Sequence, residues 1–361
     1  MHTPGTGVIA LATVSRDAVV ESTHFGSVAI CQADGRLLAN AGSREAVQFW
    51  RSSSKPLQAL SVVTSGAADR FNFTQRELSV CCGSHAGSAE HIATVRGILA
   101  KLDLDESDLN CGAHWPGDTD ERNRLIRERS EPSQLHNNCS GKHAGMLATA
   151  RALDAPTEGY LNFDHAVQRL IAVHLSLLTN VSVEQFAVGR DGCGAPTVAM
   201  PLPAMARAFA RLASADELPD ELPDAARRIC DAMAGEPVMV SSQGSFNTEL
   251  LRLGAGEFVA KGGAEGLFCM ASRSLGVGIA VKCSDGSSRP HPPVIISLMR
   301  KARIDVPDAL AERFERVPVT NCHSDTVGHV EPKHIEHMPE EQVHHAGDDK
   351  DHQDVEDKSG T

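Results

Sequence analysis

The sequence predicts a mixed α/β protein of the α+β type, in which helices flank a central, mainly antiparallel sheet. Short apolar runs bounded by turn residues cluster near both ends of the chain, and helical periodicity dominates the middle. Joining the strands of both ends in one sheet is the simplest arrangement of these elements. The 361 residues are 41% hydrophobic but only 4% aromatic, so Ala, Val, Leu and Ile must build the core.

The strands are indicated by apolar runs next to turn signals. Residues 8–11 and 28–31 are such runs, and Asp34-Gly35 is typical of a hairpin turn that leads into residues 37–38. A strand over 258–260 would end at Lys261. Residues 267–270 and 277–282 are expected to pair antiparallel, and residues 186–188 form a further candidate strand.

The most informative helix begins near Ser53 or Ser54 and continues to about residue 68, because apolar residues recur there at helical spacing. Pro56 is tolerated only in a first turn, so Ser52 is expected at the helix N-terminus. Thr74 and Glu77 have the spacing of a capping box, and the apolar residues 78–82 fit either a helix or a brief strand. Further helices are expected over 90–102, 140–153, 165–178, 203–213, 223–235 and 292–301.

Charge and composition restrict the partners of the protein. The net charge of −13 disfavours nucleic acid and anionic membranes, and no apolar run is long enough to span a bilayer. Residues 1–333 are expected to form one catalytic domain, followed by an acidic, His-rich, disordered tail over 334–361. The first residues lack a signal-peptide pattern, so we expect a cytoplasmic protein whose ten scattered cysteines form no disulfide framework.

A first group of polar residues is typical of acyl transfer. Ser52 and Lys55 are three residues apart and therefore share one helix face, where a neutral lysine could accept the serine proton. Penicillin-recognising serine enzymes combine this spacing with a second serine and a strand-borne lysine followed by a glycine motif. Ser84 and Lys261 could fill these two roles. Alone, the spacing of Ser52 and Lys55 would favour an N-cap serine before an exposed lysine, and the other residues shift the interpretation towards catalysis.

A second group contains two cysteines in polar, glycine-containing segments. Cys139 and Cys193 could bind Zn²⁺ together with one further ligand and an open position. The residue pattern leaves that ligand open between His136, Lys142 and His143. Two unlinked cysteines beside a substrate pocket are the alternative.

These segments together resemble the asparaginase II family, the rhizobial-type or class 3 L-asparaginases, over about residues 7–333. The resemblance implies hydrolysis of L-asparagine to L-aspartate and ammonia on a fold like that of serine β-lactamases and penicillin-binding proteins. The segments that carry it are residues 51–56, 82–85, 136–143, 191–196 and 261–266.

The resemblance also implies roles for individual residues and an assembly state. The catalytic pairs would be Ser52 with Lys55 and Ser84 with Lys261, and the Zn²⁺ ligands would be Cys139, Lys142 and Cys193. A homodimer is expected. Substrate contacts would come from Arg51, His85, Asn138, Asp191, Gly262 and Gly263.

The expected mechanism is covalent catalysis, in which Ser52 attacks the side-chain amide while neutral Lys55 accepts its proton. Lys261 and Ser84 would relay protons, although the sequence does not decide which serine is acylated. Two other functions remain open: a β-lactamase-like or D-peptidase-like amide hydrolase, and a non-catalytic protein that binds zinc or an amino acid on the same scaffold.

Overall fold

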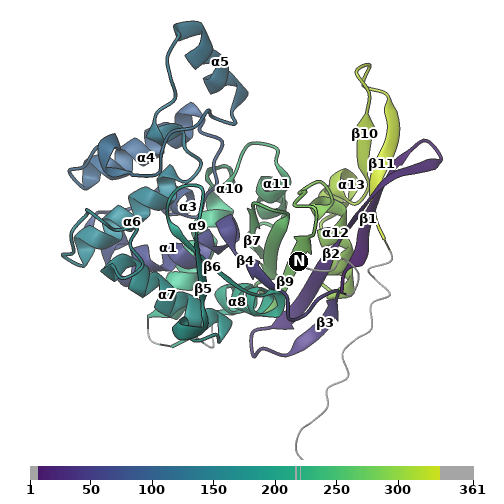
Figure 1. Cartoon of the computed structure of the whole chain (residues 1–361), viewed down its shortest axis with the longest axis horizontal. Helices are drawn as coiled ribbons and strands as arrows, with labels where there is room; N and C mark the ends of the chain where they lie inside the picture. Colours follow the sequence, from purple (N-terminus) through teal and green to yellow (C-terminus); the bar gives the residue numbers. More distant parts are fainter. Residues whose placement is uncertain (1–6, 216–217, 220, 334–361) are drawn as a thin grey trace, which may run out of the picture.

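The computed structural model describes residues 7–215, 218–219 and 221–333. Most of the domain expected over residues 1–333 is therefore visible, whereas the expected tail over 334–361 lies outside the described residues. The predicted architecture is confirmed, because an antiparallel sheet flanked by helices forms the centre of the molecule (Figure 1).

The main sheet joins strands from both ends of the chain, as the sequence predicts. Its strand order is β10-β11-β1-β2-β9-β8-β7, with β3 paired to β2, and all of its pairs are antiparallel. The strands are β1 (Ile9–Arg16), β2 (Val19–Gln32), β3 (Leu37–Ala41), β7 (Phe258–Gly263), β8 (Leu267–Ser272), β9 (Val277–Cys283), β10 (Val317–Thr320) and β11 (Thr326–Pro332).

A second, three-stranded sheet was not expected. It consists of β4 (Val47–Phe49), β6 (Pro196–Pro201) and β5 (Ala187–Arg190), so the strand anticipated near 186–188 lies outside the main sheet. Trp50 follows β4 directly and is fully buried. Its backbone N–H donates to the Val198 carbonyl of β6. This small sheet thereby fixes the chain just before Ser52.

The helices of the middle section form the larger part of the molecule. Those close to the expected ranges are α1 (Lys55–Thr64), α3 (Gln75–Cys81), α4 (Ala89–Lys101), α6 (Ser140–Ala152), α7 (Ala166–Thr179), α8 (Leu202–Ser214), α9 (Leu222–Gly235) and α12 (His291–Lys301). Those not anticipated are α2 (Ala67–Arg70), α5 (Thr119–Glu128), α10 (Pro237–Val240), α11 (Phe246–Leu253) and α13 (Asp308–Phe314). Four 3₁₀ turns in the described residues are η1 (Arg51–Ser54), η2 (Glu106–Asp108), η3 (Gln134–His136) and η4 (Val183–Gln185).

Helix α8 attaches the helical part to the sheet. It packs against β2, β8 and β9. At Gly278 of β9, an added Cβ would lie 1.9 Å from the Ala206 carbonyl oxygen of α8. Only glycine allows this close approach of helix and strand.

Helix α1 lies at the centre of the helical part. Its residues from Lys55 to Val63 are all buried, and it contacts α3, α6, α7 and α9. The turn η1 precedes it and packs on β7. The position of Ser52 is therefore determined by the helical part and the main sheet together.

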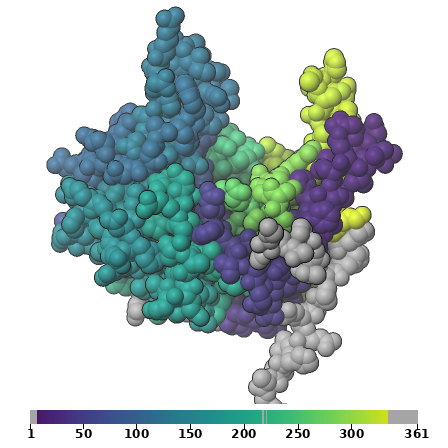
Figure 2. Space-filling model, viewed as in Figure 1, coloured from purple at the N-terminus to yellow at the C-terminus, as the bar shows by residue number. Residues whose placement is uncertain are grey.

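The molecule has two projections, which Figures 1 and 2 show at its upper edge. One contains α5, and the other contains the hairpins of β10 with β11 and of β1 with β2. The space-filling view is hollowed between them, where α11 and β7 lie (Figures 1 and 2). None of the helices in the described ranges has both the length and the apolarity required to cross a bilayer.

Candidate active site

Three of the four expected catalytic residues line one cavity of about 400 Å³. These are Ser52 in η1, Ser84 in the loop after α3, and Lys261 in β7. The fourth, Lys55, lies behind them with its Nζ 2.9 Å from Ser84 Oγ. Two hydroxyls and two amines thus meet in one place, although they come from four separate segments.

The hydrogen-bond partner of Lys55 differs from the pairing that the sequence predicts. Its Nζ donates to the Gly83 carbonyl at 2.6 Å, to Ser84 Oγ at 2.9 Å and to the Asn138 carbonyl at 3.4 Å. Three acceptors match the three N–H groups of an ammonium. Among the described contacts Lys55 therefore holds Ser84, and no hydrogen bond joins it to Ser52, which is one helical turn away.

Lys261 has the properties of a base. Its side chain is only 2% exposed and donates to the Gly262 carbonyl at 2.6 Å. Burial, together with the positive charge of Lys55, lowers the pKa of the Lys261 amine well below its usual value. This amine therefore loses its proton more readily than that of an ordinary lysine, and it lines the cavity.

The end of β7 is held by hydrogen bonds to Asn247 and by a close approach to η1 at Gly263. Asn247 of α11 donates from Nδ2 to the Ala260 carbonyl, and its Oδ1 accepts from the Gly262 N–H at 2.9 Å. At Gly263, an added Cβ would lie 2.8 Å from Ser53 Oγ and 3.1 Å from the Trp50 carbonyl oxygen. Gly263, which is expected to contact the substrate, therefore also allows β7 to approach η1 closely.

The cysteines form a second cluster with Lys142, as the resemblance implies. Lys142 Nζ lies 3.0 Å from Cys193 Sγ, and the Cys139 thiol is hydrogen-bonded to Cys193. This bond and the Lys142 ammonium lower the pKa of Cys193 to about 4 in spite of its burial. The same hydrogen bond, together with burial, raises the pKa of Cys139 to about 12, so one thiolate and one thiol lie side by side.

The donor set of this cluster fits Zn²⁺. Two sulfurs and one amine converge, and thiolate sulfur is a preferred zinc ligand. His136 has protein partners at both ring nitrogens, whereas His143 has them at Nδ1 only. His136 Nε2 is 3.1 Å from Glu121 Oε1, and His143 Nδ1 is 2.9 Å from the Leu109 carbonyl oxygen. Within the described ranges, no group of three or more His, Cys, Asp or Glu side chains is placed to hold a metal ion, so a zinc site here would need Lys142 as a ligand.

Two contacts join the clusters. Arg51 Nε donates to Asp191 Oδ1 at 2.8 Å, which links the neighbour of Ser52 to the loop of Cys193. Asn138 accepts from Lys55 through its carbonyl, and its Oδ1 lies 3.3 Å from Cys139 Sγ. The two groups of residues therefore form one continuous polar network.

Not every expected substrate contact lies on the cavity. Asn138, Gly262 and Gly263 line it. His85 is buried, and its Nδ1 accepts from the Gly87 N–H while its Nε2 is 3.0 Å from Ser140 Oγ. Because both ring nitrogens have protein partners, His85 stabilises the loop that carries Ser84 and has no nitrogen left for a substrate.

The cavity has further lining residues that the sequence motifs do not indicate. They are Ser241, Ser245, Phe246, Asn247, Phe268, Ser288, His291 and Pro292. Some of them belong to α11, whose start is marked by Ser245: its Oγ accepts from the Thr248 N–H. A serine three residues before a polar residue, followed by two leucines, is the signal that could have identified this helix.

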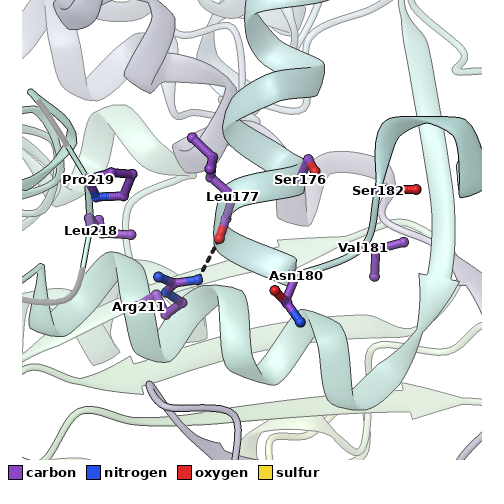
Figure 3. A pocket seen from close by; sticks show the side chains of 8 residues that line it. All are labelled: Ser176, Leu177, Asn180, Val181, Ser182, Arg211, Leu218 and Pro219. Atoms are coloured by element: carbon purple, nitrogen blue, oxygen red, sulfur yellow. Dashed lines mark hydrogen bonds between the residues drawn. The ribbon is translucent and has the colours of Figure 1, made fainter.

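A larger pocket of about 740 Å³ lies elsewhere, where the C-terminal end of α7 faces α8 (Figure 3). Its charged lining residue is Arg211, which donates to the Leu177 carbonyl at 2.6 Å. The described lining contains no serine–lysine or cysteine cluster. The expected serines and Lys261 therefore line the smaller of these two cavities.

Comparison with known proteins yields one strong match. The sequence model of the family described as L-asparaginase II matches residues 12–332. No curated protein matches the chain.

Solved structures show only distant similarity. Mglu in its native form in 4.3 M NaCl is 18% identical, with 78% of this chain and 62% of that chain covered and a TM-score of 0.36. A β-lactamase from Mycobacterium bovis is 12% identical, with 76% and 94% covered and a TM-score of 0.40. The chain spans about three fifths of that Mglu chain. TM-scores this low carry no conclusion about activity.

Proposed function

Because the chain belongs to the L-asparaginase II family, and is thus an asparaginase-type amidohydrolase, we propose that it hydrolyses L-asparagine to L-aspartate and ammonia. The observation that supports this most directly is the meeting of Ser52, Ser84 and Lys261 on one cavity, with Lys55 bonded to Ser84. A hydroxyl nucleophile needs a nearby base, and a buried neutral lysine can supply one.

In the proposed mechanism Ser52 is the attacking hydroxyl. It stands in η1, the short turn that leads into α1, and lines the cavity. The Ser52 oxygen bonds to the side-chain amide carbon, and the serine proton passes to neutral Lys261. The lowered pKa of Lys261 supports it as the base in place of Lys55.

Ser84 would deliver the proton to the departing nitrogen, so that ammonia leaves as the carbon–nitrogen bond breaks. The Lys55 ammonium holds Ser84 Oγ and replaces its proton. The proton on Lys261 then returns through Ser84 to Lys55, so that Lys261 is neutral and Lys55 is charged again. Water attacks the ester carbonyl and gives a proton to Lys261, which passes it to the Ser52 oxygen as the ester bond breaks and aspartate is released. Backbone N–H groups near Ser52 and Gly263 would hold the oxyanion.

Zn²⁺ held by Cys139, Lys142 and Cys193 would supply a fixed positive charge for the amino-acid end of the substrate. Lys142 must lose a proton to serve as a ligand. The Arg51–Asp191 ion pair would keep this end aligned with the reacting serine. We also propose the homodimer and the cytoplasmic location; size-exclusion chromatography and cell fractionation test these.

The decisive experiment measures ammonia release from asparagine and from glutamine, with and without a chelator. Turnover of asparagine is expected, and weaker turnover after chelation would support an auxiliary zinc. Binding of asparagine without ammonia release would refute the proposal and favour a non-catalytic binding protein. Turnover of a chromogenic lactam but not of asparagine would favour a lactamase-like hydrolase.

A further inference from the structure

The cavity that contains Ser52, Ser84 and Lys261 combines two kinds of lining. The two hydroxyls, the lysine amine and Asn138 are polar, whereas Phe246, Phe268 and Pro292 contribute an apolar part beside further serines, Asn247 and His291. The volume of about 400 Å³ lies in the range of roughly 300–1,000 Å³ that holds drug-sized ligands, which is more than one small amino acid requires.

The apolar part is an ordered aromatic wall. The Phe246 and Phe268 rings lie 5.4 Å apart between centroids, and the Phe268 and His291 rings 5.5 Å apart. Phe268 is 3% exposed, and Phe314 packs on Phe246 at 5.1 Å from behind. Such centroid distances are those of interacting aromatic pairs, so the wall is held in place before any ligand binds.

The wall carries no charge near neutral pH. Burial lowers the pKa of His291 to about 4, and its imidazole is therefore neutral. The adjacent helix α12 offers few backbone donors, because Pro290, Pro292 and Pro293 have no N–H and the His291 N–H is bonded to the Ser288 carbonyl. This part therefore suits an apolar or aromatic group and not an anion.

The orientation of the substrate follows from these charges. The ammonium and carboxylate of an amino acid would lose hydration against phenylalanine rings, so they must point towards the polar part. The scissile carbonyl lies at the serines, and what remains to face the aromatic wall is the departing nitrogen. A primary amide places only NH₂ there and leaves the wall without a ligand.

Building on the proposed function, we propose that the enzyme also hydrolyses secondary amides of the aspartate side chain whose nitrogen carries an aryl or other apolar group. The serine oxygen bonds to the carbonyl carbon, the carbon–nitrogen bond breaks, and the serine proton ends on the nitrogen of the released amine. Water then cleaves the ester to aspartate. The overall reaction consumes one water and needs no other reactant.

The test compares L-aspartate β-(4-nitroanilide) with L-asparagine on the full-length protein, by release of 4-nitroaniline and of ammonia. Phe246→Ala should lower the ratio of kcat/KM for the anilide to that for asparagine by about tenfold or more, as expected for lost apolar contacts in a pocket. Phe49→Ala, which alters an exposed phenylalanine outside this cavity, should leave the ratio unchanged.

The outcomes separate the two proposals. Hydrolysis of asparagine without release of 4-nitroaniline overturns this inference and leaves the proposed function intact. Release of 4-nitroaniline without asparagine turnover overturns the asparaginase proposal instead. If both substrates react but Phe246→Ala leaves their ratio unchanged, the aromatic wall does not bind the departing group and the inference fails.

Discussion

Two buried lysines in this molecule, Lys142 and Lys261, are held in opposite states. They are 4% and 2% exposed, so burial penalises the charge of both alike. Burial alone would lower the pKa of Lys142, but the sulfurs of Cys139 and Cys193 raise it above its usual value. Lys261 faces the cation Lys55 instead, and its pKa is lowered well below the usual value.

The difference shows that the neighbouring charge, and not the depth of burial, decides which lysine is a base. Lys261 loses its proton more readily than an ordinary lysine, whereas the charged form of Lys142 is favoured and lies beside Cys193. Binding of a metal by Cys139, Lys142 and Cys193 would require Lys142 to lose its proton. Lys261 would not have to change its protonation for the metal to bind. The clusters are therefore expected to respond differently to substitution, pH and chelators.

The largest expected effect is loss of either hydroxyl on the cavity. Ser52→Ala removes the proposed nucleophile and Ser84→Ala the proposed proton relay, so each should reduce ammonia release by roughly 100- to 10,000-fold. Ser130→Ala, at an exposed serine, is the matched control and should be fully active. Circular dichroism would verify folding, and near-normal activity of both cavity variants would refute the mechanism.

The next effect concerns the base. Lys261→Arg keeps the positive charge but cannot deprotonate near neutral pH, so we expect a loss of activity of about 100-fold or more. Lys101→Arg, at an exposed lysine, serves as the control. Unchanged kcat in Lys261→Arg would show that another group accepts the proton.

The pH dependence of kcat/KM tests Lys261 and the effect of Lys55 on its pKa. A base acts when it is deprotonated, so the rate should rise with pH through the pKa of Lys261, below the range of an ordinary lysine. Lys55→Met removes the cation that lowers this pKa, and the rising limb should move to higher pH even if the maximum rate falls. If the rising limb of the profile stays at the same pH, Lys55 does not lower the pKa of Lys261.

Substitution of a cysteine in the cluster of Cys139, Lys142 and Cys193 should change the zinc content of the protein more directly than the rate of the reaction. Cys193→Ser removes the thiolate, and we expect the purified protein to lose one equivalent of zinc relative to wild type. Cys322→Ser, at an exposed cysteine, should retain it. Because the histidines of residues 334–361 could bind metal in every variant, the difference between variants is the informative quantity. Equal zinc in all three proteins would exclude this cluster as the site.

The smallest effect is expected at the ion pair between the clusters. Asp191→Asn keeps the shape of the side chain but removes the charge that pairs with Arg51. We expect a rise in KM for asparagine of roughly tenfold, equivalent to about 1.4 kcal/mol, with a smaller change in kcat. A large fall in kcat at constant KM would instead place Asp191 in the chemical step.

Local sequence signals predicted the parts of the site that depend on one segment. Pro56 set the start of α1 and therefore the position of Ser52, and the Thr74–Glu77 capping box is present at α3. The cysteines were recognised because polar, glycine-containing loops are an unusual place for them. These features follow from backbone rules that act over a few residues.

Features that depend on tertiary contacts were missed. Helix α5 is strongly polar and buries only Glu121 and Leu125, so it has no clear apolar period. The pairing of Lys55 with Ser84 depends on how the loop after α3 meets α1, which spacing along the chain does not encode. The aromatic wall combines Phe246, Phe268 and His291 from separate elements, and it exists only once those elements pack.

Asn138 gives the two lysine clusters a common support, because its carbonyl oxygen faces Lys55 and its side chain faces Cys139. The rigid peptide unit that contains the Asn138 carbonyl also contains the backbone N and Cα of Cys139, so a displacement at Lys55 is passed to the cysteine. Substitutions in the two clusters should therefore have non-additive free-energy effects. An engineer who wishes to alter metal affinity without altering turnover would have to redesign this residue first.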